Sequence, residues 1–170
     1  MPGFIIDNYG AGVGTPKVHL QHLWTIARLG PVSIGQNSPA RYARDMTMPK
    51  FQVEFESVQG AAISYKYAKS IKWNDAAVTF YDVEGLAAEL EKWREKIYTD
   101  AEGIKAASPI GTGYKDNCIF HLIDGDGNVK TTYTLKGSWP SEIDYGRLTY
   151  TESDAKIITV TLTFDTAEIS

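Results

Sequence analysis

Residues 156–165 read KIITVTLTFD, and this stretch decides the fold. From Ile158 on, its large apolar side chains occupy every second position, namely Ile158, Val160, Leu162 and Phe164. The positions between them carry Thr159, Thr161 and Thr163. A period of two is the pattern of a β-strand with one face on a core. The second face is β-branched, polar and free of large apolar groups, so the sequence predicts a half-buried strand with a threonine surface.

Similar short segments precede it along most of the chain. From the apolar pattern and from turn residues we predict strands over 22–30, 40–48, 51–57, 62–68, 72–80, 118–124, 129–137, 141–151 and 156–165. Pro49 is predicted to stop the second of these, because proline cannot donate to a strand ladder. The sequence therefore predicts a mainly β protein.

Residues 51–57 alternate as regularly as the last strand. Phe51, Val53 and Phe55 are expected on the core, with Gln52, Glu54 and Glu56 in solvent. The next segment places Ile63, Tyr65 and Tyr67 on one face. A polar turn at Gln59 and Gly60 is one way to join the two strands, and a long projecting loop is the other.

One helix is predicted, from Val83 to about Thr99, with Asp82 as its N-cap. Its apolar stripe recurs at intervals of four, three and four, at Leu86, Leu90, Trp93 and Ile97. The predicted fold class is therefore an antiparallel β-sandwich or barrel with one packed α-helix.

Length and charge limit the classes of function. The 170 residues suit one domain, predicted over 22–170, after a glycine-rich flexible arm over 1–21. A net charge of −4 argues against a basic reader of nucleic acid. The single cysteine, Cys118, lies in an apolar run and is expected to be buried. No signal peptide or membrane anchor is expected from the N-terminal pattern or from any apolar window.

No motif predicts catalysis, a metal or a cofactor. GAGVGTP at 10–16 lacks the spacing of a nucleotide loop and is interpreted as part of the arm. DGDGN at 124–128 opens like a calcium loop but lacks its later glycine and glutamate, so a hairpin turn is expected. The histidines, His19, His22 and His121, do not have the spacing of a metal set. We therefore expect no enzyme.

The block LKGSWP at 135–140 carries a resemblance. Together with the tryptophan helix LEKWREKIY, the charged turn and the closing strand, it resembles the tail tube proteins of contractile-tailed bacteriophages, which are related to the tube proteins of contractile injection systems. The resemblance covers roughly residues 23–165. It does not extend to the glycine-rich arm.

The resemblance implies a structural virion protein without catalytic function or cofactor. Members of that family form six-fold rings that stack into the inner tail tube, through which DNA passes into the host. The implied partners are copies of the same chain, the tail sheath protein, a baseplate or tube initiator, the tape measure protein and passing DNA. The implied location is the phage tail, with assembly in the host cytoplasm.

Three alternatives stay open at this point. A baseplate or tube-initiator protein would share the tube fold but form a single ring. A tube protein of a bacterial contractile injection system would be structurally close to the phage protein. A small-ligand-binding β-barrel module would instead be a stable monomer with a concave pocket.

Candidate residues follow from these expectations. A channel wall should be polar and not basic, so that it does not hold DNA by its phosphates. Two faces meet this condition, namely Gln52, Glu54 and Glu56, and Thr159, Thr161 and Thr163. At least one of them is predicted to line the channel. Segments 59–70 and 99–117 and the arm are candidates for contacts between rings, since they are long for simple connections.

Five further residues are candidate fold or subunit contacts. They are Trp139, Pro140, Trp93, Tyr65 and Tyr67. Pro140 is expected to end one strand and redirect the chain to the next. Trp139 is either a core residue at that corner or a plug in a neighbouring subunit.

Overall fold

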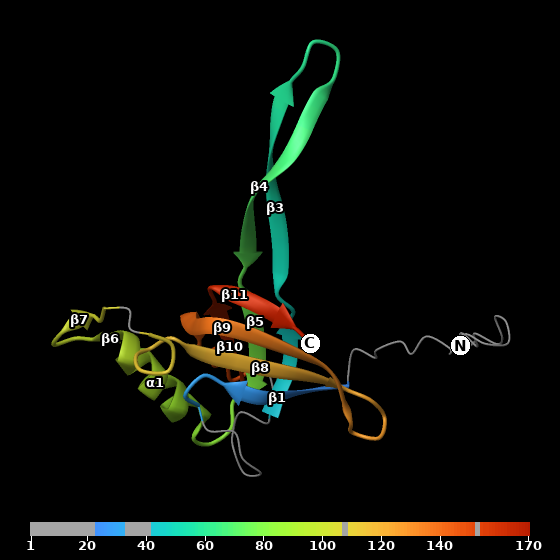
Figure 1. The fold of residues 1–170 in the computed structure, drawn as a ribbon. Coiled ribbons are helices and arrows are strands. Elements are labelled where there is room, and N and C mark those ends of the chain that lie inside the picture. The colour runs from blue at the N-terminus through green and yellow to red at the C-terminus, as the bar shows by residue number, and fades with distance from the viewer. Residues whose placement is uncertain (1–22, 33–41, 107–108, 152–153) are drawn as a thin grey trace, which may run out of the picture.

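The computed structural model describes residues 23–32, 42–106, 109–151 and 154–170 (Figure 1). The elements in chain order are β1 Trp24–Leu29, β2 Ala43–Thr47, β3 Lys50–Gln59, β4 Ser64–Asn74, β5 Ala76–Tyr81, α1 Leu86–Ile97, β6 Tyr98–Thr99, β7 Gly103–Ile104, β8 Asp116–Ile123, β9 Val129–Asp144, β10 Ile157–Thr163 and β11 Thr166–Ile169. The predicted mainly β fold with one helix is confirmed. The predicted arm over 1–21 and the pair His19 and His22 lie outside the described residues.

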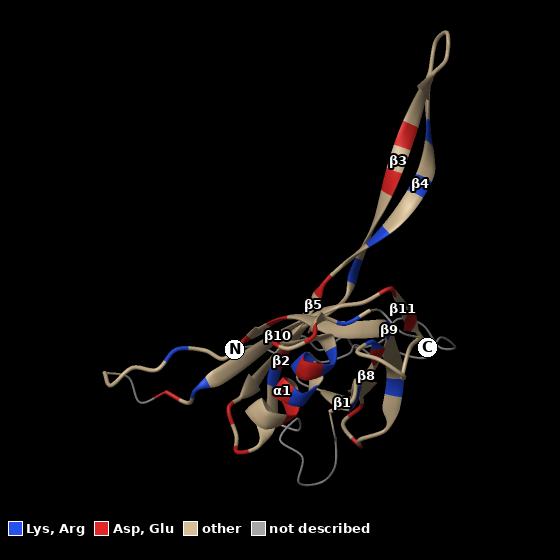
Figure 2. Ribbon diagram, turned by 90° about the vertical axis from the view of Figure 1, so that its left-hand side faces the viewer, with Lys and Arg blue, Asp and Glu red and all other residues tan. Residues whose placement is uncertain are grey.

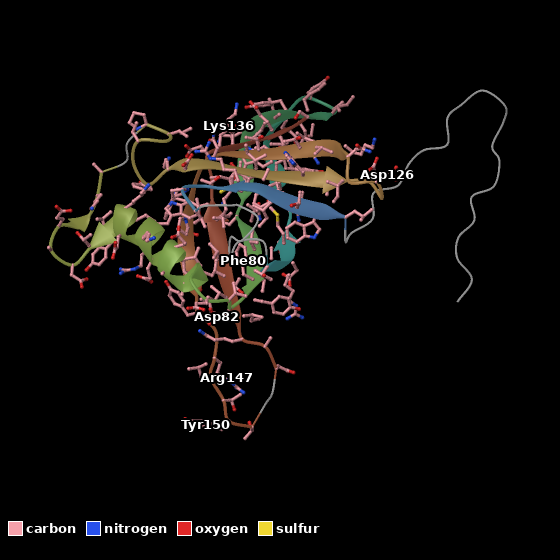
Figure 3. All side chains as sticks on the ribbon, turned by 90° about the horizontal axis from the view of Figure 1, so that it is seen from below. Phe80, Asp82, Asp126, Lys136, Arg147 and Tyr150 are labelled. Carbon is pink, nitrogen blue, oxygen red and sulfur yellow. The ribbon has the colours of Figure 1, made fainter. Side chains whose placement is uncertain are left out.

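The strands form two antiparallel layers that share β9. In the first layer, β8 lies between β1 and the first part of β9, and β11 pairs with the other side of β9. In the second layer, the last part of β9 pairs with β10, β10 with β5, and β5 with β2. Figure 3 shows β10 and β5 running across the direction of β8 and β1.

The change of layer within β9 corrects one expectation. The strand was predicted to end at Pro140, yet it continues through Pro140 to Asp144. Gly137 has a φ of 67°, and the pairing partner changes from β8 to β10 between Ser138 and Trp139. Glycine reaches this backbone region without steric cost, so the chain bends and keeps its extended course. The chain is redirected as predicted, but without a break.

The core lies between the two layers and α1. The first layer contributes Phe120 and Leu135, and the second layer contributes Val78, Phe80 and Val160. The helix contributes Leu86, Leu90 and Trp93. Three of the four residues of the predicted helix stripe, Leu86, Leu90 and Trp93, therefore form the buried face of α1, and Ile97 at its end is only partly buried. β5 and β10 alternate buried and partly or fully exposed positions, and for β10 this is the alternation that the sequence predicts.

The start of the helix differs from the prediction. The N-cap is Gly85, in the left-handed region, and its position has no side-chain cap. Asp82 instead accepts a hydrogen bond from the Lys156 ammonium at 2.6 Å. This ion pair ties the entrance of the helix to the segment before β10, so the carboxylate is used in tertiary structure rather than in capping.

A long hairpin formed by β3 and β4 projects from the body (Figure 1). It continues the β2 and β5 pair and turns at residues 60–63, as the turn at Gln59 and Gly60 predicts. All ten residues of β3 are exposed. The expectation that Phe51, Val53 and Phe55 face a core is therefore wrong, because the hairpin leaves the sheet before any second layer covers it.

Among the described residues, no helix has the length and apolar character needed to cross a bilayer.

Candidate assembly surfaces

The outer face of the second layer carries the threonines predicted from the closing strand. Thr159, Thr161 and Thr163 point away from the core, since Ile158, Val160 and Leu162 are fully buried between the layers. The neighbouring strands add small or polar groups opposite them, namely Ala77 and Thr79 on β5 and Glu142 and Asp144 on β9. We call this surface, with Asp45 and Thr47 of β2, the threonine face.

The threonine face is acidic. Asp144 lies opposite Thr159 and Glu142 opposite Thr161 in the ladder. Asp75, just before β5, accepts a hydrogen bond from the Thr163 hydroxyl at 3.0 Å. The nearby cation Arg44, at the bulge of β2, lies 3.7 Å from the Asp45 carboxylate. Arg147 lines the pocket at the Thr159 end of this face. Among the described residues of the face and its rim, four carboxylates thus stand against two cations, which favours a negative potential; they are Asp45, Asp75, Glu142 and Asp144 against Arg44 and Arg147.

The second predicted face, Gln52, Glu54 and Glu56, lies on the projecting hairpin. The Glu54 carboxylate accepts a hydrogen bond from Ser70 at 2.9 Å. Glu56 lies 3.6 Å from the Lys69 ammonium, and Lys72 is directly opposite Gln52 in the ladder. The pairing with β4 therefore places lysines beside these carboxylates (Figure 2). The absence of lysine that suggested a channel wall holds for residues 51–59 and does not hold for the surface, since Lys50 begins β3 and the β4 lysines lie beside it.

The hairpin also exposes large apolar side chains. Eight of them keep between 41% and 64% of their surface in water, namely Phe51, Val53, Phe55, Val58, Tyr65, Tyr67 and Ile71 on the strands and Ile63 in the turn. At the base, Trp73 joins the hairpin to the body, with ring centroids 5.6 Å from Phe51 and 5.9 Å from Phe164. A monomer rarely leaves so many large apolar side chains in water, so the hairpin is a candidate interaction surface.

The two predicted tryptophans have different surroundings. Trp93 is fully buried, and its indole N–H donates to the Tyr114 carbonyl at 2.9 Å. Gly30 lies against the same ring, so closely that a Cβ there would come within 2.6 Å of it. Trp93 therefore holds the helix, the end of β1 and the segment before β8 together. It is a residue of the fold.

Trp139 is half-buried and lies on the outer side of its layer. It is opposite Thr163 in the ladder and packs edge-on against Tyr114, with ring centroids 5.8 Å apart. Pro140 is buried and opposite Leu162. Trp139 is thus available at the end of the threonine face, while Pro140 belongs to the interior.

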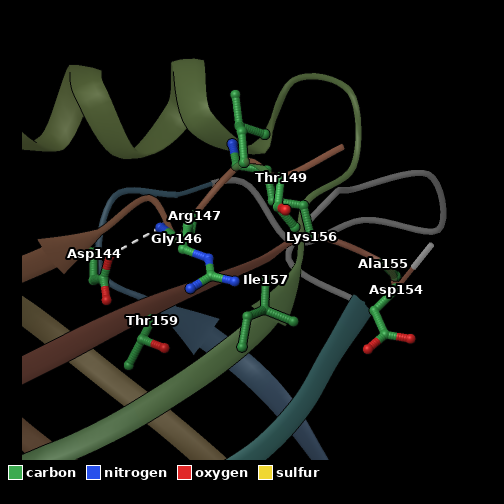
Figure 4. A pocket seen from close by; sticks show the side chains of 10 residues that line it. Asp144, Gly146, Arg147, Thr149, Asp154, Ala155, Lys156, Ile157 and Thr159 are labelled. Carbon is green, nitrogen blue, oxygen red and sulfur yellow. Dashed lines mark hydrogen bonds between the residues drawn. The ribbon is translucent and has the colours of Figure 1, made fainter. Parts of the chain in front are cut away.

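A pocket of about 320 Å³ lies at the end of the second layer (Figure 4). It is lined by the ends of β9 and β10 and by the described part of the loop between them. Its Asp144 carboxylate accepts from the Gly146 N–H at 2.8 Å, and the Lys156 ammonium is paired with Asp82. Two of the four charged residues that line the pocket are therefore engaged by the fold, and Arg147 and Asp154 are the other two.

The motifs that the sequence excluded behave as structural elements. Asp124 accepts hydrogen bonds from the backbone N–H groups of Asp126 and Asn128, which closes the turn between β8 and β9. These bonds, with Lys130, lower the pKa of Asp124 below its usual range. Cys118 is fully buried, and burial raises its pKa to about 12. Within the described residues, no group of three metal-ligating side chains occurs.

Comparison with solved structures identifies the fold. The chain matches the sheath and tube terminator of an extracellular contractile injection system, PVC, with a TM-score of 0.67 and 13% identity, over 94% of this chain and 99% of that one. It matches the tube-terminating cap of the anti-feeding prophage with a TM-score of 0.64 and 11% identity, over 94% and 95%. A chain of the PVC sheath-tube complex matches with a TM-score of 0.62 and 13% identity, over 86% of each chain.

These likenesses establish the fold over nearly the whole chain. It is the tail-tube-like fold of contractile injection systems, which confirms the resemblance drawn from the LKGSWP block and the closing strand. Sequence comparison adds nothing to this, since no family model and no curated protein matches the chain.

Two features of the surfaces were missed from the sequence. Glu142 and Asp144 extend the threonine face, and their alternation within SEID carried the signal. Val58 falls out of phase with Phe51, Val53 and Phe55, which was the sign that the hairpin does not have one apolar ladder face throughout.

Proposed function

We propose that the chain is a ring-forming structural subunit of the inner tube of a contractile tail, with rings of six subunits stacked into a conduit for DNA. The observation that carries the proposal is the threonine face, a polar and acidic sheet surface on the fold of tube proteins. The proposed role is structural and involves no catalysis. The proposed location is the tail particle, with assembly in the host cytoplasm.

The threonine face is the proposed channel wall. Threonines and carboxylates offer DNA no cluster of cations, so phosphates are not held and passage stays fast. Thr159, Thr161 and Thr163 form its middle row, with Glu142 and Asp144 beside them. The candidate set Gln52, Glu54 and Glu56 is less suited, since Lys69 and Lys72 accompany it.

Ring closure supplies the partner that the second layer needs. Within the described residues, β2 is paired only with β5, and the last part of β9 only with β10. Both edges of this layer therefore keep unpaired backbone groups, which a neighbouring copy is able to satisfy. Closure of six such layers makes a continuous barrel with the threonine face inside.

The remaining partners follow from the proposed tube. The outer surface would contact the tail sheath protein, the first ring would rest on a baseplate initiator, and the tape measure protein and DNA would occupy the channel. One of the matched structures is a sheath-tube complex, which supports the sheath as a partner of this fold.

A terminal ring is the second candidate. Two of the matched structures, at TM-scores of 0.67 and 0.64, are a sheath and tube terminator and a tube-terminating cap. A baseplate component matches at a TM-score of 0.59. A terminal or baseplate protein would form one ring and stop, whereas a tube subunit propagates. Electron microscopy of the purified protein distinguishes a single ring from a stack of rings.

The first experiment is electron microscopy of the purified protein over a concentration series. Stacked rings with a channel are the expected result for a tube subunit, and single rings would favour the terminal role. A protein that stays monomeric at high concentration, with or without baseplate components, would refute both and return attention to a ligand-binding module.

A labelling experiment tests the channel wall. Thr161→Cys should react with a small maleimide in assembled tubes but resist a maleimide carrying a bulky polymer, which is excluded from the channel. Lys92→Cys, on the exposed side of α1, is the matched control. The native Cys118 is buried and does not interfere. Equal labelling of Thr161→Cys by both reagents in long tubes would place the threonine face outside.

A further inference from the structure

The hairpin of β3 and β4 has two ladder faces that are set by its register. In an antiparallel pair, directly opposed residues point to the same face. Near the base, Phe51 is opposite Trp73, Val53 opposite Ile71 and Phe55 opposite Ala68. We call this side the first face. The second face holds the residues between them, beginning with Gln52 opposite Lys72 and Glu54 opposite Ser70.

The apolar side chains change face halfway along the hairpin. Toward the tip, Val58 is opposite Tyr65 and Glu56 opposite Tyr67, and all four lie on the second face. The first face becomes polar there, with Ser57 opposite Lys66 and Gln59 opposite Ser64. The change comes just after the register shift between Glu54 and Phe55, where Lys69 is the extra residue of a β-bulge, since Phe55 is the last apolar residue of the first face.

The ribbon itself turns over in the same interval. In Figure 1, β4 lies to the left of β3 near the body and to the right of it near the tip, and Figure 2 shows the same exchange from the side. A two-stranded ribbon twists strongly, and a bulge increases the twist. When the strands exchange sides, an observer who first saw the first face then sees the second.

The change of ladder face and the turning over of the ribbon cancel each other. The first face near the base and the second face near the tip point to the same side of the hairpin. We propose that the seven exposed apolar residues of the two strands form one continuous stripe along that side, and that a neighbouring copy of this chain covers the whole stripe. The stripe consists of Phe51, Val53, Phe55, Ile71, Val58, Tyr65 and Tyr67. Glu56 also lies on the stripe side, 3.6 Å from the Lys69 ammonium, whereas the opposite side stays polar with Gln52, Glu54, Ser57 and Ser64.

The area of the stripe suits a second subunit. Four aromatic and three aliphatic side chains with these exposed fractions leave on the order of 700 Å² in water, close to the roughly 800 Å² per partner of a standard interface. Such a surface is ample for specific association between proteins. The proposal rests on the proposed function in one respect, namely that the partner is another copy of the chain.

Because of the bulge and the twist, one ladder face and one side of the hairpin carry different residues near the tip, and this difference can be tested. If the ladder faces alone mattered, a partner covering the first face would contact Ser57 and Ser64 rather than Val58 and Tyr65. If the stripe is continuous in space, the partner contacts Val58 and Tyr65 and leaves Ser57 and Ser64 in solvent. Val58→Lys and Tyr65→Lys are therefore the test variants, and Ser57→Lys and Ser64→Lys are controls at adjacent positions of the same strands.

The experiment measures the critical concentration for assembly of each purified full-length variant by sedimentation, with electron microscopy of the pellets. All four residues are exposed in the monomer, so thermal unfolding of the dilute protein should be unchanged. A lysine charge buried in the contact should raise the critical concentration about tenfold or more for Val58→Lys and Tyr65→Lys, and the controls should stay within about twofold of the wild type.

The outcomes separate this proposal from the tube function. If the wild type assembles and the stripe variants assemble as readily as the controls, or the controls are impaired instead, the stripe is refuted and the tube role stands. If the wild-type chain never self-associates, the second copy is wrong as the partner and the tube role falls with it.

Discussion

Substitution of Trp93 tests whether this residue belongs to the fold or to a subunit contact. The side chain is fully buried among the helix, Gly30 and the segment that contains Tyr114, and its N–H bonds to the Tyr114 carbonyl at 2.9 Å. Trp93→Ala removes the largest fully buried side chain and leaves a cavity, which costs about 3–5 kcal/mol of unfolding free energy. This is a large share of the roughly 5–15 kcal/mol that stabilises a typical domain.

Trp93→Phe separates packing from hydrogen bonding. It keeps an aromatic ring in the site but removes the donor, leaving the Tyr114 carbonyl without that partner at a cost of about 1–3 kcal/mol. The loss should therefore be clear but smaller than for alanine. Glu95→Ala, on the exposed side of the same helix, is the control and should stay within about 0.5 kcal/mol.

The assay is urea unfolding of the dilute, unassembled protein, followed by circular dichroism. The urea midpoint should be highest for Glu95→Ala, lower for Trp93→Phe and lowest for Trp93→Ala. The dependence of the unfolding free energy on urea concentration should be unchanged. A loss below about 1 kcal/mol for Trp93→Ala would refute the packing argument. Assembly lost with monomer stability intact would instead make Trp93 a subunit contact.

Three further predictions concern the body of the protein. Gly137→Ala should lower stability by about 1–3 kcal/mol in urea unfolding, because its φ is positive and a Cβ would overlap the Asp165 carboxylate, whereas Gly125→Ala has open space around it and should cost much less. Cys118 should not react with a thiol reagent at pH 8 in the native protein, since it is buried and its pKa is raised to about 12, and should react fully in urea. The pKa of Asp124 is lowered by folding, so its contribution is present above about pH 4 and is lost as the pH falls through the folded pKa; Asp124→Asn should flatten the dependence of the urea midpoint between pH 7 and pH 3.

Each of these has a contrary outcome. Equal stabilities for the two alanine variants would mean that the bend in β9 does not need glycine. Reaction of the native thiol faster than global unfolding would show local opening around β8. An acid limb that is the same in the wild type and the asparagine variant would mean that other carboxylates control acid unfolding.

Much of the second layer was predictable from local pattern. Alternation in residues 156–165 gave β10 and identified Ile158, Val160 and Leu162 as core, because side chains of a strand alternate regardless of its neighbours. The stripe of α1 was equally clear, and the turn at 124–128 followed from its glycines and aspartates. The short strand β11 was missed, since its four residues have no strong pattern of their own.

The same local reasoning failed on the hairpin. Phe51, Val53 and Phe55 alternate as clearly as the residues of β10, yet they face water. An alternating pattern predicts that the two faces of a strand differ in polarity. It does not predict that another part of the chain packs against the apolar face. That depends on whether a second layer lies within reach, which is a property of the whole chain and of its neighbours.

By itself, then, the sequence determined the class of fold, the core of the second layer, the helix face and the threonine row, because each depends on the short-range geometry of a strand or helix. Only the tertiary structure decided which apolar face stays uncovered, which lysines stand beside Glu54 and Glu56, and on which side of the hairpin Val58 and Tyr65 lie. These depend on register, on the bulge at Lys69 and on the twist of the ribbon, which arise from pairing between distant residues.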